Sequence, residues 1–234
     1  ISGQLNPCQF VVNPQGVAHP ASFWECVHPL LWQLHDLLDH APLRVVADAY
    51  FSKAPFVNPL VKAGIDVISK LRHDAVGWDD PTAEQRSDAQ RGKKWKLAHL
   101  LEHLPLQTLT VHLYGEQVQV HAVSRIMNLR NFDVKVKVVV IQGLTRPILL
   151  FSTDCALSAA QIIEIYGARF RIELAIRGLK QHLGLGDYQC YRGTALQRFV
   201  HLVCIAFNLF RLIQLQPETH PEWPTDVDNS TSTS

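Results

Sequence analysis

Four polar residues between positions 166 and 180 have a spacing that would place them together on one helix. Apolar residues recur at helical intervals from Ser158 to Leu183, which predicts a single helix over this range. At about 100° per residue, the four polar residues fall within an arc of roughly 60°. They are Tyr166, Arg169, Glu173 and Lys180, and Arg177 extends the same face. This row of a phenol, a carboxylate and cations is the chain's main candidate for chemistry.

An apolar stripe runs beside the polar row on the predicted helix. Its members fall between about 220° and 280° when Tyr166 is set to zero. They are Ile165, Ile172, Ile176, Leu179 and Leu183. We therefore expect the helix to bury this edge and to present the polar row beside it. The spacing alone also fits a simpler interpretation, in which Glu173 forms ordinary surface ion pairs with Arg169 and Arg177.

The residue identities add a specific resemblance. The pattern Tyr166-x2-Arg169-x3-Glu173-x6-Lys180, within YGARFRIELAIRGLKQHLGL, resembles the Y-R-E-K signature of DDE transposases from bacterial insertion sequences. Upstream, VVADAYFSKAPFVNPLVKAGIDVISKLR resembles the segment that carries the second catalytic aspartate of that family, which would here be Asp48.

The resemblance covers about residues 43–192 and implies an enzyme that cleaves and joins DNA at insertion-sequence ends. It implies an RNase H-like core in which carboxylates hold two divalent ions for phosphoryl transfer, and hard oxygen ligands favour Mg²⁺ or Mn²⁺. Asp48 and Glu173 would be two of the three acidic ligands. The residues that would hold DNA phosphates are Tyr166, Arg169, Lys180 and Arg177. The implied partners are the double-stranded DNA of the transposon ends and of the target, bound by a homodimer.

The first catalytic aspartate of that family has no clear counterpart in this chain. Before Asp48 the sequence offers only Asp36, Asp39 and Glu25, which we expect on a solvated surface. We therefore expect a chain truncated at its N-terminus and inactive on its own. An alternative makes Asp48 the first aspartate and Asp154 the second, although Asp154 lies only nineteen positions before the glutamate and suits the start of the helix.

A strand–helix–strand unit is expected to position Asp48. The apolar run Leu43–Ala47 ends at Asp48 and predicts a buried strand. Ser52 is expected to cap a helix that ends at Gly64, and residues 66–70 predict a second strand. This order indicates a parallel crossover, and ligands collect at the carboxyl ends of such strands, where Asp48 lies.

The remaining segments complete an α/β fold, namely a partial RNase H-like core interrupted by an antiparallel β-rich insertion. Alternating apolar residues predict strands at 108–114, 118–122, 133–141 and 148–151, and helical spacing predicts helices at 23–40 and 195–215. Residues 77–92 are polar and predict a linker. The predicted domains are 1–76, the middle of the core with Asp48; 77–152, linker and insertion; 153–216, C-terminal helices with Glu173; and 217–234, a disordered tail.

Composition indicates a globular chain whose partners must be recognised locally. Hydrophobic residues make up 47% and charged residues 18%, which excludes a disordered protein. Because the formal net charge is only +1, contacts with DNA must come from local clusters. One cluster is Lys93-Lys94-Trp95-Lys96, in which Trp95 either stacks on a base or anchors the segment. The apolar run Phe199–Leu215 is shorter than the roughly 20 residues of a membrane span, so we expect a buried helix, no membrane and a cytoplasmic protein near the nucleoid.

Two other functions fit parts of the sequence. A remnant that binds DNA or intact transposase without catalysis would share most of these features. The segment from His99 to His103 matches H-x-x-E-H, an inverted zinc-peptidase motif in which Glu102 would act as the base. The motif is short and its helix ends at Pro105, so the peptidase is the weaker alternative.

Overall fold

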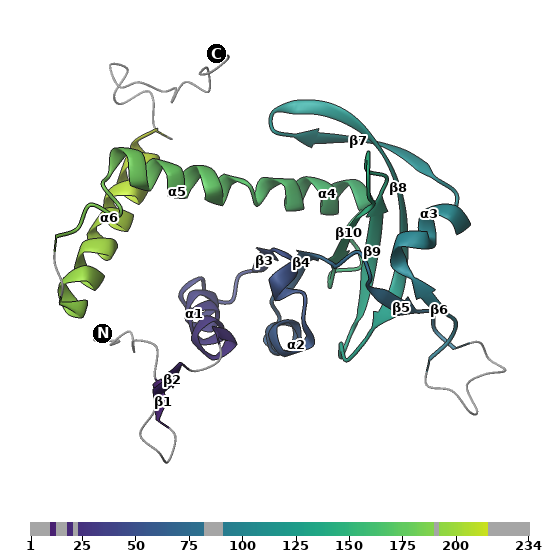
Figure 1. Ribbon diagram of the computed structural model, residues 1–234, viewed down its shortest axis with the longest axis horizontal. Helices are drawn as coiled ribbons and strands as arrows, with labels where there is room; N and C mark the ends of the chain where they lie inside the picture. Colours follow the sequence, from purple (N-terminus) through teal and green to yellow (C-terminus); the bar gives the residue numbers. More distant parts are fainter. Residues whose placement is uncertain (1–9, 13–17, 21–22, 82–90, 190–191, 215–234) are drawn as a thin grey trace. The chain divides into compact units, whose positions relative to one another are not determined.

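The structure, a computed structural model, describes residues 10–12, 18–20, 23–81, 91–189 and 192–214 (Figure 1). The chain divides into two units, Ile1–Arg169 and Phe170–Ser234, and each is described by itself. The first unit holds a large sheet with helices. It also holds a short hairpin of β1 (Phe10–Val12) and β2 (Ala18–Pro20), and the helix α1 (Phe23–Leu37). The predicted tail at 217–234 lies outside the described residues.

The predicted strand–helix–strand crossover is confirmed. β3 (Arg44–Ala47) and β4 (Asp66–Lys70) are parallel neighbours, and α2 (Ala54–Lys62) connects them. The apolar side of α2 is fully buried through Phe56, Val57 and Leu60. Burial of this side against the sheet explains why the helix tolerates Pro59 in its interior.

The predicted cap of α2 is wrong. Lys53 is the N-cap residue of this helix, because the Ser52 hydroxyl is already engaged in the preceding turn. There Ser52 Oγ donates a hydrogen bond to the Ala49 carbonyl at 2.7 Å, at the end of the 3-10 turn η1 (Ala49–Phe51). The turn between β3 and α2 is therefore ordered by side-chain hydrogen bonds that the sequence pattern did not indicate.

The predicted β-rich segment continues the same sheet. The strand order is β3-β4-β10-β9-β8-β5-β6, and β7 pairs with β8 beside this path. Among the described strands of this sheet, every pair other than β3–β4 is antiparallel. The added strands are β5 (Val76–Trp78), β6 (Lys94–Lys96), β7 (Gln107–Leu113), β8 (Glu116–Leu129), β9 (Lys135–Ile141) and β10 (Ile148–Ser152). The predicted α/β class is confirmed, whereas the predicted linker at 77–92 is wrong at its start, which belongs to β5.

Both faces of the sheet are covered, as the alternation along β9 shows. Val138 and Val140 enter one apolar cluster, with α2 and the short helices η2 (Leu97–His99) and α3 (Leu100–His103). Val139 enters a second cluster, with α4 (Ala159–Ala168). Because successive side chains of a strand point to opposite faces, a strand segment covered on both faces is apolar throughout, as in VVVI at 138–141.

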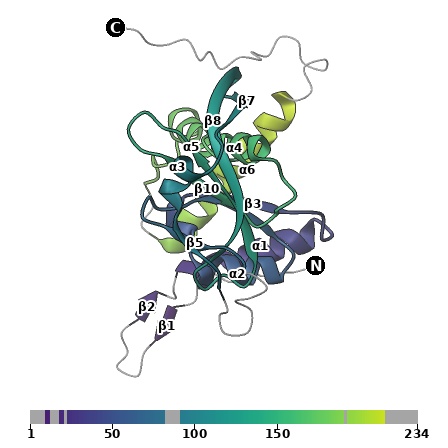
Figure 2. The ribbon, with the colours of Figure 1, turned by 90° about the vertical axis from the view of Figure 1, so that its right-hand side faces the viewer.

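The β7–β8 hairpin projects beyond the other strands of the sheet (Figure 1 and Figure 2). Its two-residue turn consists of Tyr114 and Gly115, which have φ values of 56° and 89°. Two central residues with positive φ form the turn type that matches the twist of a hairpin. The turn places Tyr114 at the tip of the hairpin, near Tyr166 in the last turn of α4 (Ala159–Ala168).

The second unit contains two helices, α5 (Arg171–His182) and α6 (Gly193–Gln214). The predicted position of the last helix is confirmed, but its predicted burial is wrong, because Val203 is the one buried residue among those described in α6. The apolar run that the sequence places at 199–215, which alone is shorter than a membrane span, overlaps a longer segment, because Gly193–Ile213 is long and apolar enough to cross a membrane by length and composition. A single helix of this kind is weak evidence for a membrane.

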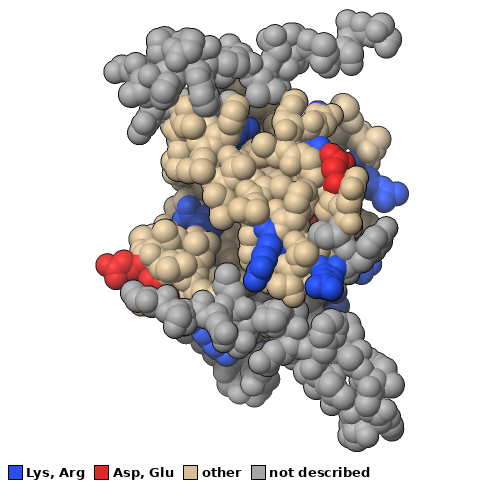
Figure 3. All heavy atoms as spheres, turned by 90° about the vertical axis from the view of Figure 1, so that its left-hand side faces the viewer, with Lys and Arg blue, Asp and Glu red and all other residues tan. Residues whose placement is uncertain are grey.

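On the face drawn in Figure 3, charged side chains are few and scattered.

Candidate active site

Asp48 lies immediately after β3, at the carboxyl end of a parallel strand, as predicted. Its side chain accepts a hydrogen bond at Oδ1 from the Tyr50 backbone N–H at 2.9 Å, so it caps η1. Its carbonyl oxygen accepts a hydrogen bond from the hydroxyl of buried Ser69 on β4 at 2.7 Å. The backbone at Asp48 is thus fixed from two sides, while the side chain is exposed. The second carboxylate oxygen makes no hydrogen bond within the described part of the chain and can accept a ligand.

Tyr166, in the last turn of α4, is close enough to Asp48 to be affected by its charge. α4 packs across β3, β4, β7, β8 and β10. Burial raises the pKa of the Tyr166 phenol, Arg169 lowers it, and the negative charges of Asp48 and Tyr114 raise it further. The fold therefore brings together Asp48 and Tyr166, which are remote in sequence, at the carboxyl end of β3.

Arg169 lies beside Tyr166. Its guanidinium carbon is 5.8 Å from the centroid of the Tyr166 ring, and its side chain is hydrogen-bonded to the Tyr166 phenol. A cation over an aromatic ring is attracted by the negative face of the ring. Three of the six predicted site residues, namely Asp48, Tyr166 and Arg169, therefore lie in the first unit, and the charges of Asp48 and Arg169 both act on the Tyr166 phenol.

A capping box fixes the start of α4. Ser158 Oγ accepts a hydrogen bond from the Gln161 backbone N–H at 3.2 Å, and Gln161 Oε1 accepts one from the Ser158 N–H at 2.8 Å. This reciprocal pair satisfies two of the backbone donors that a helix start leaves open. The sequence predicted a helix start at this residue, and the structure confirms it.

The hairpin fixes the far end of α4. Glu164 Oε1 accepts a hydrogen bond from the His112 backbone N–H at 2.8 Å and lies 3.3 Å from His112 Nδ1. These bonds lower the pKa of Glu164, the backbone bond most. Gly167 permits the close approach, because a Cβ there would lie 2.5 Å from Leu113 Cδ2. β7 and its turn thus hold the helix where Tyr166 meets Asp48.

The predicted single helix over 158–183 is wrong. Helical hydrogen bonding is interrupted at Arg169 and Phe170, although both keep right-handed helical dihedrals (φ −54°, ψ −33° and φ −58°, ψ −23°). The predicted apolar stripe is also wrong in α5, where Ile172 and Ile176 are 57% and 42% exposed. No residue of α5, which the structure describes in full, is buried.

Three further predicted site residues lie on α5 in the second unit. Glu173, Arg177 and Lys180 are spaced so that they share one face of this helix. Because Asp48 and Glu173 belong to different units, their joint role in one site stays a prediction.

The geometry gives Asp154 a structural role rather than a place beside Asp48. Asp154 Oδ2 accepts a hydrogen bond from Arg44 at 2.9 Å, and Oδ1 accepts one from the Ala156 N–H at 3.0 Å. Arg44 begins β3 and Asp48 follows its end, so the strand separates the two by about 13 Å. The alternative that pairs Asp48 with Asp154 in one metal site therefore has no support.

The carboxylates before Asp48 are not part of the site either. Asp36 and Asp39 are exposed near the end of α1, and Asp36 lies 3.7 Å from His40 in an exposed ion pair. The predicted solvated surface is thus confirmed for both. Glu25 falls on α1, and its side chain lies outside the described residues.

The H-x-x-E-H segment does not assemble as a zinc site. Glu102 pairs with His99 at 3.2 Å, while the ring of His103 packs at 5.4 Å from the ring of Trp95. The described residues contain no group of three or more potential metal ligands among His, Cys, Asp and Glu. The two histidines therefore have separate partners.

Sequence reasoning missed Tyr114. It stands at the tip of the β7–β8 hairpin and contributes to the raised pKa of Tyr166. The sequence signal was the Tyr-Gly turn, which predicts a hairpin but not the helix that the hairpin tip approaches.

Comparison with known proteins identifies one family. The family described as transposase DDE domain matches residues 7–209, which is well over half of the chain. No match was found among curated proteins.

Proposed function

The chain belongs to the transposase DDE domain family, and on this premise we propose that it carries part of the site that cuts and joins DNA at the ends of a bacterial insertion sequence. Transposases of this family bind DNA at transposon ends and generally use divalent metal ions. The observation that carries the proposal is that Asp48, at the carboxyl end of β3, acts electrostatically on the Tyr166 phenol, whose ring lies beside Arg169. We propose that the protein acts as a homodimer on DNA in the bacterial cytoplasm, at the nucleoid.

Asp48 has the properties of a metal ligand. Its carboxylate is exposed, its backbone is fixed, and one oxygen remains open for coordination. Glu173, four positions after Arg169, is the second proposed ligand. Hard carboxylate oxygens suit Mg²⁺ or Mn²⁺. Two such ions supply activation of the attacking oxygen and stabilisation of the leaving oxygen in phosphoryl transfer.

The neighbours of Asp48 are proposed to hold the DNA strand. The Tyr166 phenol, whose pKa burial raises above its ordinary value, is protonated at neutral pH and can donate a hydrogen bond to a phosphate oxygen. Arg169 is held against the same ring and can donate to the same or the next phosphate. Arg177 and Lys180, one and two turns beyond Glu173 on α5, are proposed to extend this phosphate track.

The two-metal site that the family resemblance implies requires a third carboxylate. We propose that this carboxylate is not among these 234 residues. Asp36 and Asp39 are solvated, and Asp154 is bound to Arg44. β3 is the terminal strand on its side of the described sheet, so a further strand could pair there and bring a ligand beside Asp48. We therefore propose that the chain alone binds DNA but does not cleave it.

An excision assay in cells tests the function, with the complete gene as it stands in its genome. Asp48→Asn and Glu173→Gln are each expected to lower excision by on the order of a thousandfold or more, because ligands of one site act as a unit. Asp39→Asn is the matched control and should excise like the wild type. Excision by Asp48→Asn at the wild-type level would refute the assignment of Asp48.

A second arm uses the purified 234-residue chain with Mn²⁺ and a duplex that carries the transposon end. We expect no strand cleavage. Robust cleavage would show that the third ligand is present after all, and Asp154→Asn would then be the first variant to examine. If the product of the complete gene binds the transposon ends but never excises the element, the result would instead favour the alternative function, a remnant that binds DNA without catalysis.

A further inference from the structure

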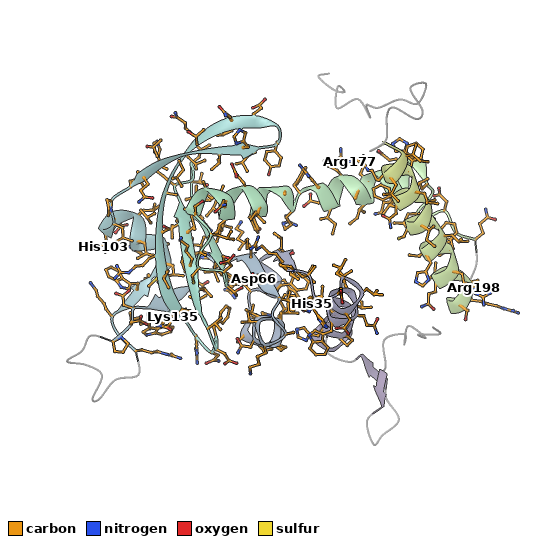
Figure 4. All side chains as sticks on the ribbon, turned by 180° about the vertical axis from the view of Figure 1, so that it is seen from behind. His35, Asp66, His103, Lys135, Arg177 and Arg198 are labelled. Atoms are coloured by element: carbon orange, nitrogen blue, oxygen red, sulfur yellow. The ribbon has the colours of Figure 1, made fainter. Side chains whose placement is uncertain are left out.

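Cations gather on β6 and in the segment just before it, at the edge of the sheet opposite β3. We call Arg91, Lys93, Lys94 and Lys96 the basic strip. β6 is the last strand of the order that begins with β3, about 30 Å away along the sheet at about 4.8 Å per strand spacing. Figure 4 labels His103 and Lys135 on this side of the sheet, away from Asp66 on β4. The basic strip is therefore separate from the proposed active site.

Two tryptophan rings organise the cations of the strip. Lys93 Nζ lies 3.9 Å from the centroid of the Trp95 ring, and Arg91 Cζ lies 4.7 Å from that of Trp78. Lys94 Nζ also lies over Trp78, at 5.9 Å. A cation over an aromatic face is restrained in position. The entropy cost of fixing its side chain when an anion binds is therefore smaller.

Trp95 is anchored, which decides between the two roles that the sequence left open. Its indole N–H donates a hydrogen bond to Asp79 Oδ2 at 2.7 Å. Lys93 and Arg125 both lie over the ring, and the His103 ring packs against it. The ring therefore supports cations and anchors the segment, and it offers no open face for stacking on a base.

The aspartates next to the strip are neutralised by other cations. Asp79 pairs with Arg125 at 2.9 Å, and Asp80 pairs with Lys135. None of the four cations of the basic strip forms a salt bridge with a residue that the structure describes. In a chain with a formal net charge of +1, this is a local excess of positive charge, and such an excess marks a candidate nucleic-acid contact.

The backbone of β6 spaces the lysines suitably for a DNA strand. Lys94 and Lys96 are exposed and lie two residues apart, so both point to the same side at a separation of about 7 Å. Each strand of B-DNA carries one charge per roughly 3.4 Å of axis, so this separation spans about two phosphates. Gly92 keeps the segment against β5, because a Cβ there would lie 2.3 Å from the Asp80 carbonyl oxygen.

We propose that the basic strip binds the phosphate backbone of double-stranded DNA, about one helical turn from the phosphate that is held at Asp48. The inference rests on the proposed function for its choice of DNA as the partner. One turn of B-DNA is about 34 Å long, close to the distance along the sheet between β3 and β6. Contact at both edges would let one sheet hold the same duplex at two points.

The test is a titration of the 234-residue chain with a labelled 30-base-pair DNA duplex, in EDTA, at several salt concentrations. The variant K93Q/K94Q/K96Q removes three charges but keeps the side chains long and polar. Each lost phosphate contact lowers the slope of log K against log salt by about 0.9, so we expect the slope to fall by about 2 to 3. The matched control K93R/K94R/K96R keeps the charges and should keep the wild-type slope. Thermal unfolding by circular dichroism confirms that all three proteins are folded.

The outcomes separate this inference from the proposed function. If the wild type binds DNA and the glutamine variant shows the same slope, the basic strip is not a DNA contact, while the proposed function stands. If the folded wild type binds no duplex at all, both fail. An RNA duplex of the same sequence is the further comparison. If it binds more tightly than the DNA duplex, and if the glutamine variant lowers its slope of log K against log salt by the same amount, the partner is RNA and the assignment to DNA is overturned.

Discussion

The two helices that share the Tyr-Arg-Glu-Lys pattern differ in what holds them. α4 begins with a capping box, buries Ala159, Ile162 and Ile163 against the sheet, and is bonded to the β7–β8 hairpin through Glu164. α5 has no side-chain cap and no buried residue, although its own spacing of apolar residues is equally helical. The half of the pattern that lies within reach of the Asp48 charge is the half that the sheet anchors.

The comparison shows that apolar periodicity does not by itself produce burial. Ile162 and Ile172 belong to one continuous helical pattern in the sequence, yet the former is fully buried and the latter mostly exposed. Periodicity indicates which residues share a face of a helix. Burial of that face also requires another element of the protein to pack against it. For α4 that surface is the sheet.

The largest expected difference between the helices concerns stability. Ile162→Ala should lower the free energy of unfolding by about 2–5 kcal/mol, because it leaves a cavity against the sheet. Ile172→Ala should change it by about 0.5 kcal/mol or less, because the side chain is exposed. Urea denaturation measures both. Equal costs for the two substitutions would mean that α5 is packed as well as α4, and the contrast would disappear.

A pair of glycines gives a smaller effect, with opposite signs in the two helices. A Cβ at Gly167 would lie 2.5 Å from Leu113 Cδ2, so Gly167→Ala should destabilise by about 1 kcal/mol after the gain in helix propensity is counted. A Cβ at Gly178 would lie 3.7 Å from Phe207, an ordinary contact. Gly178→Ala should therefore stabilise by up to about 1 kcal/mol. Melting temperatures that move in the same direction would show that the close approach of α4 to β7 is not restrictive.

The smallest effect concerns the pKa of Tyr166, which reports how close α4 lies to Asp48. Burial and the charge of Asp48 raise this pKa, so Asp48→Asn should lower it, whereas Arg169→Gln should raise it. Because the folded pKa lies above its usual value near 10, the contribution of Tyr166 to stability is present below that pH and is lost as the pH rises through the folded pKa. A titration of the labelled tyrosine ring by NMR measures the shift. An unchanged Tyr166 pKa in Asp48→Asn would place Tyr166 outside the influence of the Asp48 charge.

Much of the fold could be predicted from the sequence, because it depends on near neighbours. The β3–α2–β4 crossover, the β-rich strands and the start of α4 at Ser158 each follow from local periodicity, turns or caps. β5 was missed because three residues in a polar stretch carry too little alternation to indicate a strand. The break between α4 and α5 was missed because Arg169 and Phe170 keep helical dihedrals and carry no helix-breaking residue type.

The sequence by itself determined which residues could do chemistry and which elements carry them, because residue type and local spacing are written along the chain. The tertiary structure alone decided which of them lie near one another: Tyr166 near Asp48, Arg44 with Asp154, and Trp95 with Arg125. Those pairs join segments that are remote in sequence or that lie on different strands. Their proximity follows from the packing of the whole sheet, whose free energy is a sum over contacts that no local pattern contains.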